Sequence, residues 1–530
     1  MPTPINHKKL QQFLSGYDTD KTNYLVNGFE NGFDLRNIKF EPNDTDNNQR
    51  SATSQPNVVD KKLNKELELG RLMGPLDVPP FDNFVISPLG IRPKKTPGEF
   101  RVIHDLSFPY NGTSINDGIP RDQATVKYAS VYDAISSILK FGRNCYLAKT
   151  DIRSAFRIIP ISPSNYHLLG FKWKDKYYFD RCLPMGASSS CAIFESLSTA
   201  LEWIICKYTR NVEVVHVLDD FLIISPSERL CQLALNQFTH ICDCIGIPLA
   251  PEKTMGPTHC LPFLGIELDT KQMIAFLPKD KVDKFMNLLM TFLESKSVTL
   301  KSLQSLTGML NFACQIIIPA RAFSRRLYNL SIGVKKSYYK IKMTKEVKAD
   351  LRVWKHFLEE YNFQTFFLDS IWLSNDILEL YTDAAGSIGY AAIFKNHWLA
   401  DIWHEDCRNL NITILELYPI CIAIHIWAKE LQNKCLHIFT DNQAVSYILN
   451  SFTSKEKSCM ILIRHLVLIC MKFNILIKSS HLPGVENKLA DLISRQRIEE
   501  ARLLKPELDR YPIPVPADLQ LQKFLEGLQN

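Results

Sequence analysis

The sequence lacks the features that mark secreted and membrane-spanning proteins. Its N-terminus has no apolar core that could act as a signal peptide. The most apolar long stretch, residues 460–477, is interrupted by Arg464, His465 and Lys472, which makes it too polar to cross a bilayer. The 14 cysteines include no C-x-x-C pair, which argues against a zinc ribbon or a redox motif. We therefore expect a soluble intracellular protein with reduced thiols, in the nucleus or the cytoplasm and without a membrane partner.

Acidic residues are scarce in one part of the chain. The net charge is +6, but residues 321–355 hold eleven Lys and Arg against two acids. Aromatic residues are interleaved with these cations, namely Tyr328, Tyr338, Tyr339 and Trp354. Such a stretch suits a polyanion such as nucleic acid, although a solvated helical face would have a similar composition.

The most informative stretch is residues 214–224, where Asp219 and Asp220 stand between two apolar, β-branched runs. Each run is typical of a buried strand, and the acids fall where a tight turn is expected. Neighbouring side chains on a straight strand point to opposite faces, so these carboxylates converge only near a turn. Converging carboxylates repel unless a cation lies between them, and Mg²⁺ prefers oxygen ligands. The alternative is that Asp is simply a common turn residue.

Several other segments around this stretch have candidate roles. Residues 94–105 predict a hairpin whose cations could hold a triphosphate, or a plain exposed turn. An apolar strand ends at Asp151, and Phe156 follows it in a turn of small residues. Residues 172–179 predict another hairpin, and residues 183–194 open a helix through a Gly/Ser-rich loop that could meet a substrate or only cap the helix.

A second set of acids lies in residues 376–500. Two predicted strands end at Asp383 and Asp441, while Glu416 and Asp491 fall within predicted helices. Acids at strand ends can converge at one edge of an α/β sheet, although any one of them alone is more often a cap or a surface charge. His481 precedes Leu-Pro-Gly in a predicted loop.

The first group of segments, in this order, resembles the reverse transcriptases of retroelements. The sequences of residues 103–109 and 183–190 are most similar to the corresponding segments of tyrosine-recombinase (DIRS-type) retrotransposons. Val217 departs from the family pattern, which has an aromatic residue two positions before the Asp pair. The resemblance implies that Asp151, Asp219 and Asp220 hold two Mg²⁺ ions, or Mn²⁺ in their place. It also implies nucleotide-binding roles for Lys94, Arg101, Phe156, Met185, Gly186 and Lys253, in which Lys94 and Arg101 grip the triphosphate, Phe156 excludes a 2′-hydroxyl, and Lys253 is a candidate proton donor to pyrophosphate.

The second set of acids is similar to that of ribonuclease H. The resemblance implies that Asp383, Glu416, Asp441 and Asp491 bind two further Mg²⁺ ions, and that His481 shuttles protons. The implied partners are an RNA template, a DNA primer, the RNA–DNA hybrid and dNTPs. No protease triplet, integrase zinc pattern or recombinase core is found, so those activities would come from a separate chain. The alternatives are an inactive or host-adopted nucleic-acid-binding protein, and a ribonuclease H on a dead polymerase scaffold.

The expected fold is an α+β right-hand polymerase, with fingers, palm and thumb, followed by a mixed α/β ribonuclease H-like domain. We expect an N-terminal region at residues 1–60, with a disordered linker at 41–57. The fingers and palm would span 61–270, the basic thumb and connection 271–375, the nuclease 376–498, and an extended tail 499–530.

Overall fold

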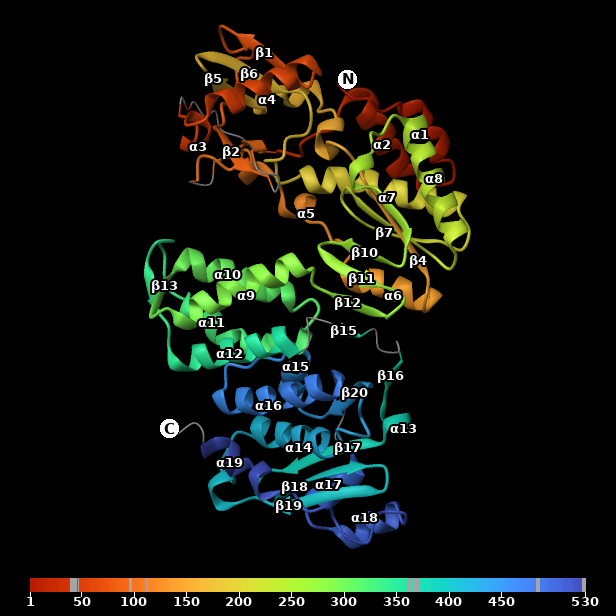
Figure 1. Cartoon of the computed structure of the whole chain (residues 1–530), viewed down its shortest axis with the longest axis vertical. Coiled ribbons are helices and arrows are strands. Elements are labelled where there is room, and N and C mark those ends of the chain that lie inside the picture. Colours follow the sequence, from red (N-terminus) through yellow and green to blue (C-terminus); the bar gives the residue numbers. More distant parts are fainter. Residues whose placement is uncertain are drawn as a thin grey trace. The chain divides into compact units, whose positions relative to one another are not determined.

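The computed structural model describes residues 1–38, 45, 47–94, 98–110, 113–360, 365–366, 371–482 and 487–526. The chain divides into two compact units, Met1–Leu264 and Gly265–Asn530. Figure 1 shows their helices and strands. Within the described residues, no helix combines the length and the apolar character needed to cross a bilayer.

The first unit is built around a four-stranded sheet with the order β7-β8-β4-β9. Its strands are β4 (Tyr146–Asp151), β7 (Glu213–Val217), β8 (Asp220–Ser225) and β9 (Met255–Thr258). Three helices pack against this sheet, namely α6 (Val131–Phe141), α7 (Ser190–Tyr208) and α8 (Glu228–Ile245). β8 is buried along almost its whole length, which explains why its sequence contains a continuous run of apolar residues.

Smaller sheets carry the other predicted hairpins of this unit. β2 (Leu89–Pro93) pairs with β3 (Phe100–His104), and β5 (Gly170–Trp173) pairs with β6 (Lys176–Asp180). β1 (Leu72–Leu76) adds to β6. The hairpin predicted at 172–179 is therefore confirmed, while that predicted at 94–105 begins earlier, at Leu89, and residues 95–97 of its turn lie outside the described residues. Two shorter elements are α5 (Arg121–Ala124) and β10 (Cys260–Phe263).

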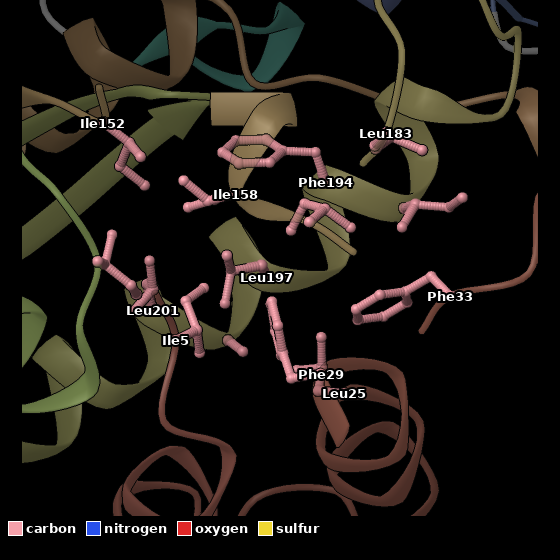
Figure 2. Close-up of a cluster of buried hydrophobic side chains, with 14 of the residues drawn as sticks. Ile5, Leu25, Phe29, Phe33, Ile152, Ile158, Leu183, Phe194, Leu197 and Leu201 are labelled. Atoms are coloured by element: carbon pink, nitrogen blue, oxygen red, sulfur yellow. The ribbon is translucent and has the colours of Figure 1, made fainter. Parts of the chain in front are cut away.

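The N-terminal segment is part of the core, which its irregular apolar pattern did not predict. It forms α1 (His7–Phe13) and α2 (Thr19–Asn31). Figure 2 shows Ile5, Leu25 and Phe29 packed with Leu197 and Leu201 of α7 in one hydrophobic cluster. These side chains are buried because α7 presents an apolar face to them.

The disordered linker predicted at 41–57 is wrong for its second half. Residues 39–44 and 46 lie outside the described residues. α3 (Arg50–Thr53) and α4 (Pro56–Glu68) follow. Ala52, Val59 and Leu63 are buried against β2 and β5, so a polar segment with few apolar groups is ordered by its neighbours.

The second unit begins with a short sheet and a group of helices. The strands β11 (Ile266–Asp269), β12 (Ile274–Phe276) and β15 (Thr365–Phe366) pair in that order. The helices are α9 (Lys279–Glu294), α10 (Leu300–Ala313), α11 (Arg325–Leu330) and α12 (Lys345–Glu360), and a ribbon of β13 (Ser297–Thr299) and β14 (Lys340–Lys342) joins them. Trp354, predicted to be one of the surface aromatics, is fully buried on α12, where it packs near Phe285 and Phe357.

The rest of this unit holds two three-stranded sheets. β17 (Leu380–Ala385), β18 (Gly389–Phe394) and β19 (His397–Ile402) are antiparallel. β16 (Trp372–Leu373), β20 (Cys435–Thr440) and β21 (Leu476–His481) are parallel, and β17 lies beside β20. The helices are α13 (Asn375–Leu378), α14 (Ile412–Ile426), α15 (Gln443–Ser451), α16 (Lys457–Phe473) and α17 (Lys488–Ser494). α14 is buried almost all round, as expected of a helix between a sheet and another helix.

The tail is also more ordered than the extended linker predicted for residues 499–530. It contains α18 (Ile498–Leu504) and α19 (Leu521–Glu526). Leu519 and Leu521 are buried, and the Tyr418 hydroxyl donates a hydrogen bond of 3.0 Å to the Leu519 carbonyl. The proline-rich sequence of the tail did not reveal these contacts, because they depend on residues about 100 positions away.

Candidate active sites

The Asp219–Asp220 stretch forms the predicted hairpin between β7 and β8. Val217 pairs with Asp220, which leaves Leu218 and Asp219 as a two-residue turn, and Leu218 adopts φ 53°. A branched residue rarely adopts a positive φ, so the surrounding strands hold this turn under local strain. The turn directs two carboxylates to one end of the sheet.

Asp151 lies at the same end of the sheet. It ends β4 and is the register partner of Asp220 across the β4–β8 pair. The backbone N–H of Ile152 also donates to the Asp219 carbonyl oxygen over 3.0 Å. Asp151 is buried, while Asp219 and Asp220 are half-buried. The fold therefore brings the three predicted carboxylates together.

The electrostatics of this set call for a cation. Burial, followed by the charges of Asp151 and Asp220, raises the pKa of Asp219 to about 6. Lys253 supplies a positive charge, because its Nζ lies 2.6 Å from Asp151 Oδ2. Burial opposes the charge on Lys253, but the hydrogen bond to Asp151 and the neighbouring carboxylates raise its pKa overall.

The three carboxylates are suitable ligands for a hard divalent cation, although their side chains do not lie close enough together to coordinate one. Three carboxylates that repel one another, with an ammonium against the most buried of them, are an anionic oxygen site of the kind that Mg²⁺ prefers. Across the described parts of the chain, no group of three His, Cys, Asp or Glu side chains is close enough to form a complete metal site as it stands.

The predicted nucleotide-binding residues lie on four separate segments, one of which carries Lys253. Lys94 and Arg101 belong to the β2–β3 hairpin, where Lys94 Nζ pairs with Glu99 Oε2 at 2.9 Å and Arg101 is exposed. Phe156 lies in the turn that follows Asp151, half-buried, with its ring edge-on to Phe194 at 5.5 Å. Met185 is exposed in the loop before α7.

Gly186 makes the closest approach in that loop, and a residue that the sequence did not reveal holds it. A Cβ on Gly186 would lie 1.8 Å from the His104 carbonyl oxygen, so only glycine fits. Asn116 Nδ2 donates to the Gly186 carbonyl over 2.9 Å, and Asn116 Oδ1 accepts from the Ser188 N–H at 2.8 Å. Asn116 therefore clamps both sides of the loop.

Two serines of the same loop bind backbone carbonyls of the surrounding chain. The Ser189 hydroxyl donates to the Leu35 carbonyl, and the Ser190 hydroxyl donates to the Pro184 carbonyl over 2.6 Å. Both side chains are buried. Ser189 is the N-cap residue of α7, but its side chain makes no capping hydrogen bond, so the capping expected of these hydroxyls is not found.

A buried ion network lies behind Phe156. Arg157 donates to Asp180 over 2.7 Å and to Glu66 over 2.9 Å, and His104 Nδ1 lies 3.4 Å from Asp180. Burial opposes the charge on Asp180, but Arg157 and His104 hold its pKa below the usual range. Because Arg157 follows Phe156 directly, this network fixes the turn that carries the phenyl ring. The only sign of this buried network in the sequence is a pair of charged residues within apolar runs.

The second set of carboxylates also assembles, within the second unit. Asp383 on β17 and Glu416 on α14 are buried, Asp491 on α17 is half-buried, and Asp441 is exposed just after β20. Burial, then Asp491 and Asp441, raises the pKa of Asp383 to about 6, against a hydrogen bond from Ser494. Burial, then Asp383 and Asp441, raises the pKa of Glu416 to about 9. Asp383 therefore lies within electrostatic reach of the other three acids.

The neighbours of these acids partly neutralise them. The Ser494 hydroxyl donates to Asp383 Oδ2 over 2.6 Å, and Arg495 Nε pairs with Asp491 Oδ1 at 2.7 Å. The set is rich in oxygen and poor in positive charge at its buried end, which again fits a divalent cation.

His481 lies at the end of a strand rather than in the predicted loop. It is the last residue of β21 and is exposed, with Nε2 3.0 Å from the Asp441 carbonyl oxygen. Residues 483–486 of the expected loop lie outside the described residues. The structure thus brings His481 to the backbone of one of the four acids.

Comparisons with known proteins concern the segment that carries the first set of acids. Residues 93–268 match the family described as reverse transcriptase (RNA-dependent DNA polymerase). The chain is 27% identical over 236 residues to the Pro-Pol polyprotein of simian foamy virus type 1, covering 44% of this chain and 18% of that protein. It is 28% identical over 208 residues to the Pro-Pol polyprotein of feline foamy virus, covering 39% and 16%. The chain thus spans less than a fifth of the length of these relatives.

A solved structure shows the same fold. The foamy viral protease-reverse transcriptase dRH in complex with double-stranded DNA aligns with a TM-score of 0.51 at 16% identity. The alignment covers 89% of this chain and 81% of the other. At this identity the likeness establishes a polymerase fold and carries no residue roles.

Proposed function

From the reverse transcriptase domain at residues 93–268, we propose that this protein is an RNA-directed DNA polymerase that extends a DNA primer on an RNA template. The observation that carries the proposal is the meeting of Asp151, Asp219 and Asp220 at one end of the β4–β8 pair, beside Lys253. Nucleotidyl transfer needs cations around the phosphates and anionic ligands that hold those cations in place. The three carboxylates supply these ligands.

Each residue has a part in this proposal. The three carboxylates would hold two Mg²⁺ ions, or Mn²⁺, which when bound would neutralise charge at the reacting phosphate. Lys94 and Arg101 would bind the triphosphate through charge-assisted hydrogen bonds. Phe156 would lie under the sugar and exclude a 2′-hydroxyl, Met185 and Gly186 would line the pocket, and Lys253 would donate a proton to the leaving pyrophosphate.

Primer extension tests this proposal. The purified chain should extend a DNA primer on an RNA template with dNTPs and Mg²⁺, and chelation by EDTA should stop it. Asp219→Asn removes one charge with little change in shape and should lower the rate by at least about 100-fold. Asp243→Asn, at an exposed position of α8, is the matched control and should extend normally. Full extension by Asp219→Asn would refute the assignment.

A ribonuclease H activity is the second candidate, because a separate carboxylate set has assembled. Asp383 lies within electrostatic reach of Glu416, Asp441 and Asp491, and the pKa of buried Glu416 is raised to about 9. We propose that they hold two divalent cations and cleave the RNA strand of the hybrid, with His481 moving the proton. Burial is the first cause of this raised pKa and the neighbouring carboxylates are the second, and a bound cation would favour the charged form.

Cleavage of a labelled RNA–DNA hybrid tests the second activity. Wild-type chain should cut the RNA strand, and Asp441→Asn should not. Glu430→Gln, which removes an exposed carboxylate after α14, is the control. Cleavage that survives in Asp441→Asn would show that these acids do not form a nuclease.

The class of genetic element that encodes the chain is proposed from the sequence resemblance. We place the chain in a retrotransposon of the tyrosine-recombinase (DIRS) type, where a separate chain would supply recombinase or integrase activity. The rival is a catalytically inactive or host-adopted protein that only binds nucleic acid. Both carboxylate sets are intact, which favours an active enzyme, and the primer-extension assay separates the two.

A further inference from the structure

A turn in the second unit displays two tyrosines and a row of lysines to solvent. We name it the lysine–tyrosine ledge, made of Lys335, Lys336, Tyr338, Tyr339, Lys340 and Lys342. The Tyr338 side chain is 65% exposed and the Tyr339 side chain 46%. Exposed adjacent aromatics are unusual on a surface that water alone contacts, so the ledge is a candidate for binding.

The ledge is held rigidly by the start of α10. The Leu300 N–H donates to the Tyr339 carbonyl over 3.0 Å, and the Lys301 N–H donates to the Ser337 carbonyl over 2.9 Å. The β13–β14 ribbon, which places Ile341 in the core, anchors the other side. The free N–H groups of a helix N-terminus are thus satisfied by the turn itself, which keeps the tyrosines in place before any partner binds.

The charge around the ledge has one sign. No Asp or Glu occurs in the sequence between Glu294 and Glu346. Lys296 and Lys301 are exposed next to the ribbon and add to the four lysines of the ledge. Lys336 Nζ lies 5.9 Å from the centre of the Tyr338 ring and 5.8 Å from that of Tyr339. A phosphate beside a base stacked on either ring would therefore meet an ammonium group.

We propose that the lysine–tyrosine ledge binds an unpaired nucleic-acid strand by stacking bases on Tyr338 and Tyr339 and pairing phosphates with the lysines. The two kinds of side chain together favour a single strand. Lysines alone suit any polyanion, but exposed aromatic rings offer stacking to bases that have left a duplex, and every base has a face to stack. The inference concerns binding and holds whether or not either active site is catalytic.

Fluorescence anisotropy of labelled 20-nucleotide oligo(U) and oligo(dT), with the full chain in EDTA, tests the ledge. Tyr338→Ala/Tyr339→Ala should weaken binding of both about tenfold or more, because each stacked base contributes substantially. Tyr338→Phe/Tyr339→Phe should restore it, since the ring is kept. Lys335→Gln/Lys336→Gln should lower the slope of log Kd against log salt by about 1.4, as expected for two phosphate contacts on a single strand.

Two controls separate the ledge from other binding surfaces of the chain. Tyr511→Ala removes a tyrosine that is 70% exposed beside Arg510, outside any lysine cluster, and should leave binding unchanged. Crosslinking of 4-thiouridine-substituted oligo(U), mapped by mass spectrometry, should label Tyr338 or Tyr339. Thermal unfolding should be alike for all variants, because the changed side chains are exposed.

The contrary outcomes are equally specific. Equal loss of affinity for a 20-base-pair RNA–DNA hybrid in the Tyr→Ala variant would show that the ledge follows a duplex and does not select an unpaired strand. Equal competition by poly-glutamate at matched charge would show a surface that reads charge alone, as an acidic protein partner would use. Crosslinks confined to residues of the first unit, with no effect of the tyrosine variant, would also overturn the proposal.

Discussion

Lys253 reduces the repulsion between the carboxylates of the first site. Its ammonium lies against Asp151, the most buried acid of the first set, and so offsets the charge that raises the pKa of Asp219. The sequence indicated a proton donor, and a lysine whose pKa is held up by carboxylates stays charged and ready to donate. The role remains a prediction, but the placement is suitable for it.

Asn116 leads to a prediction at this scale. Asn116→Ala removes the hydrogen bonds to Gly186 and Ser188, each worth about 1 kcal/mol, and so loosens the loop that carries Met185. The KM for dNTPs should rise about tenfold, while kcat should fall less, because the carboxylates are untouched. Steady-state primer extension at varied dNTP concentration measures both.

A matched asparagine provides the control for this prediction. Asn236→Ala, at an exposed position of α8, should leave both constants unchanged. A fall in kcat at constant KM would mean that Asn116 acts on chemistry or folding and not on the nucleotide pocket.

The site residues differ in how far sequence reveals them. The seven acids could be found because each lies in or next to an apolar strand or helix pattern, and such patterns are local, although Asp383 lies within β17 and not at its end as predicted. Asn116, His104, Asp180 and Arg157 could not, since their roles come from contacts between residues up to 91 positions apart, as in the Arg157–Glu66 pair. Nothing in the spacing along the chain reports such contacts.

At the scale of elements, agreement follows the strength of the local pattern. The apolar strand predicted to end at Asp151 is β4, which ends at that residue, and the hairpin predicted at 172–179 is formed by β5 and β6. The misses are α1, α2, α3 and the tail helices, whose apolar residues are few and find partners only in the folded chain. Trp354 was misplaced because it stands among the cations of residues 321–355, while the apolar stripe of α12 that includes it is buried.

The tail gives a prediction at the scale of elements. Leu521 at the start of α19 is 2% exposed, so Leu521→Ala should leave a cavity and lower the free energy of unfolding by about 2–4 kcal/mol. Leu503→Ala is the matched control, since that leucine of α18 is 83% exposed and the change should cost less than about 0.5 kcal/mol. Urea unfolding compares the two. Similar midpoints for both variants would show that α19 does not pack as the structure has it.

At the scale of the whole molecule, each carboxylate set is complete within one compact unit. Asp151, Asp219, Asp220 and Lys253 lie in residues 1–264, and Asp383, Glu416, Asp441 and Asp491 lie in residues 265–530. Neither set borrows an acid from the other unit. The polymerase and nuclease proposals are therefore separable by substitution, although one chain carries both.

This separation predicts complementation between chains. A mixture of Asp219→Asn and Asp441→Asn chains should both extend a primer on an RNA template and degrade the copied RNA, because each variant keeps one intact set of acids. Either variant alone should perform one reaction, and the double variant neither, since each substitution changes only one of the two sets of acids. A primer-extension reaction with end-labelled RNA and labelled primer follows both products in one tube. If the mixture made DNA but left the RNA intact, the nuclease would have to act in the same chain that is copying, and the two sites would be coupled through the nucleic acid that they share.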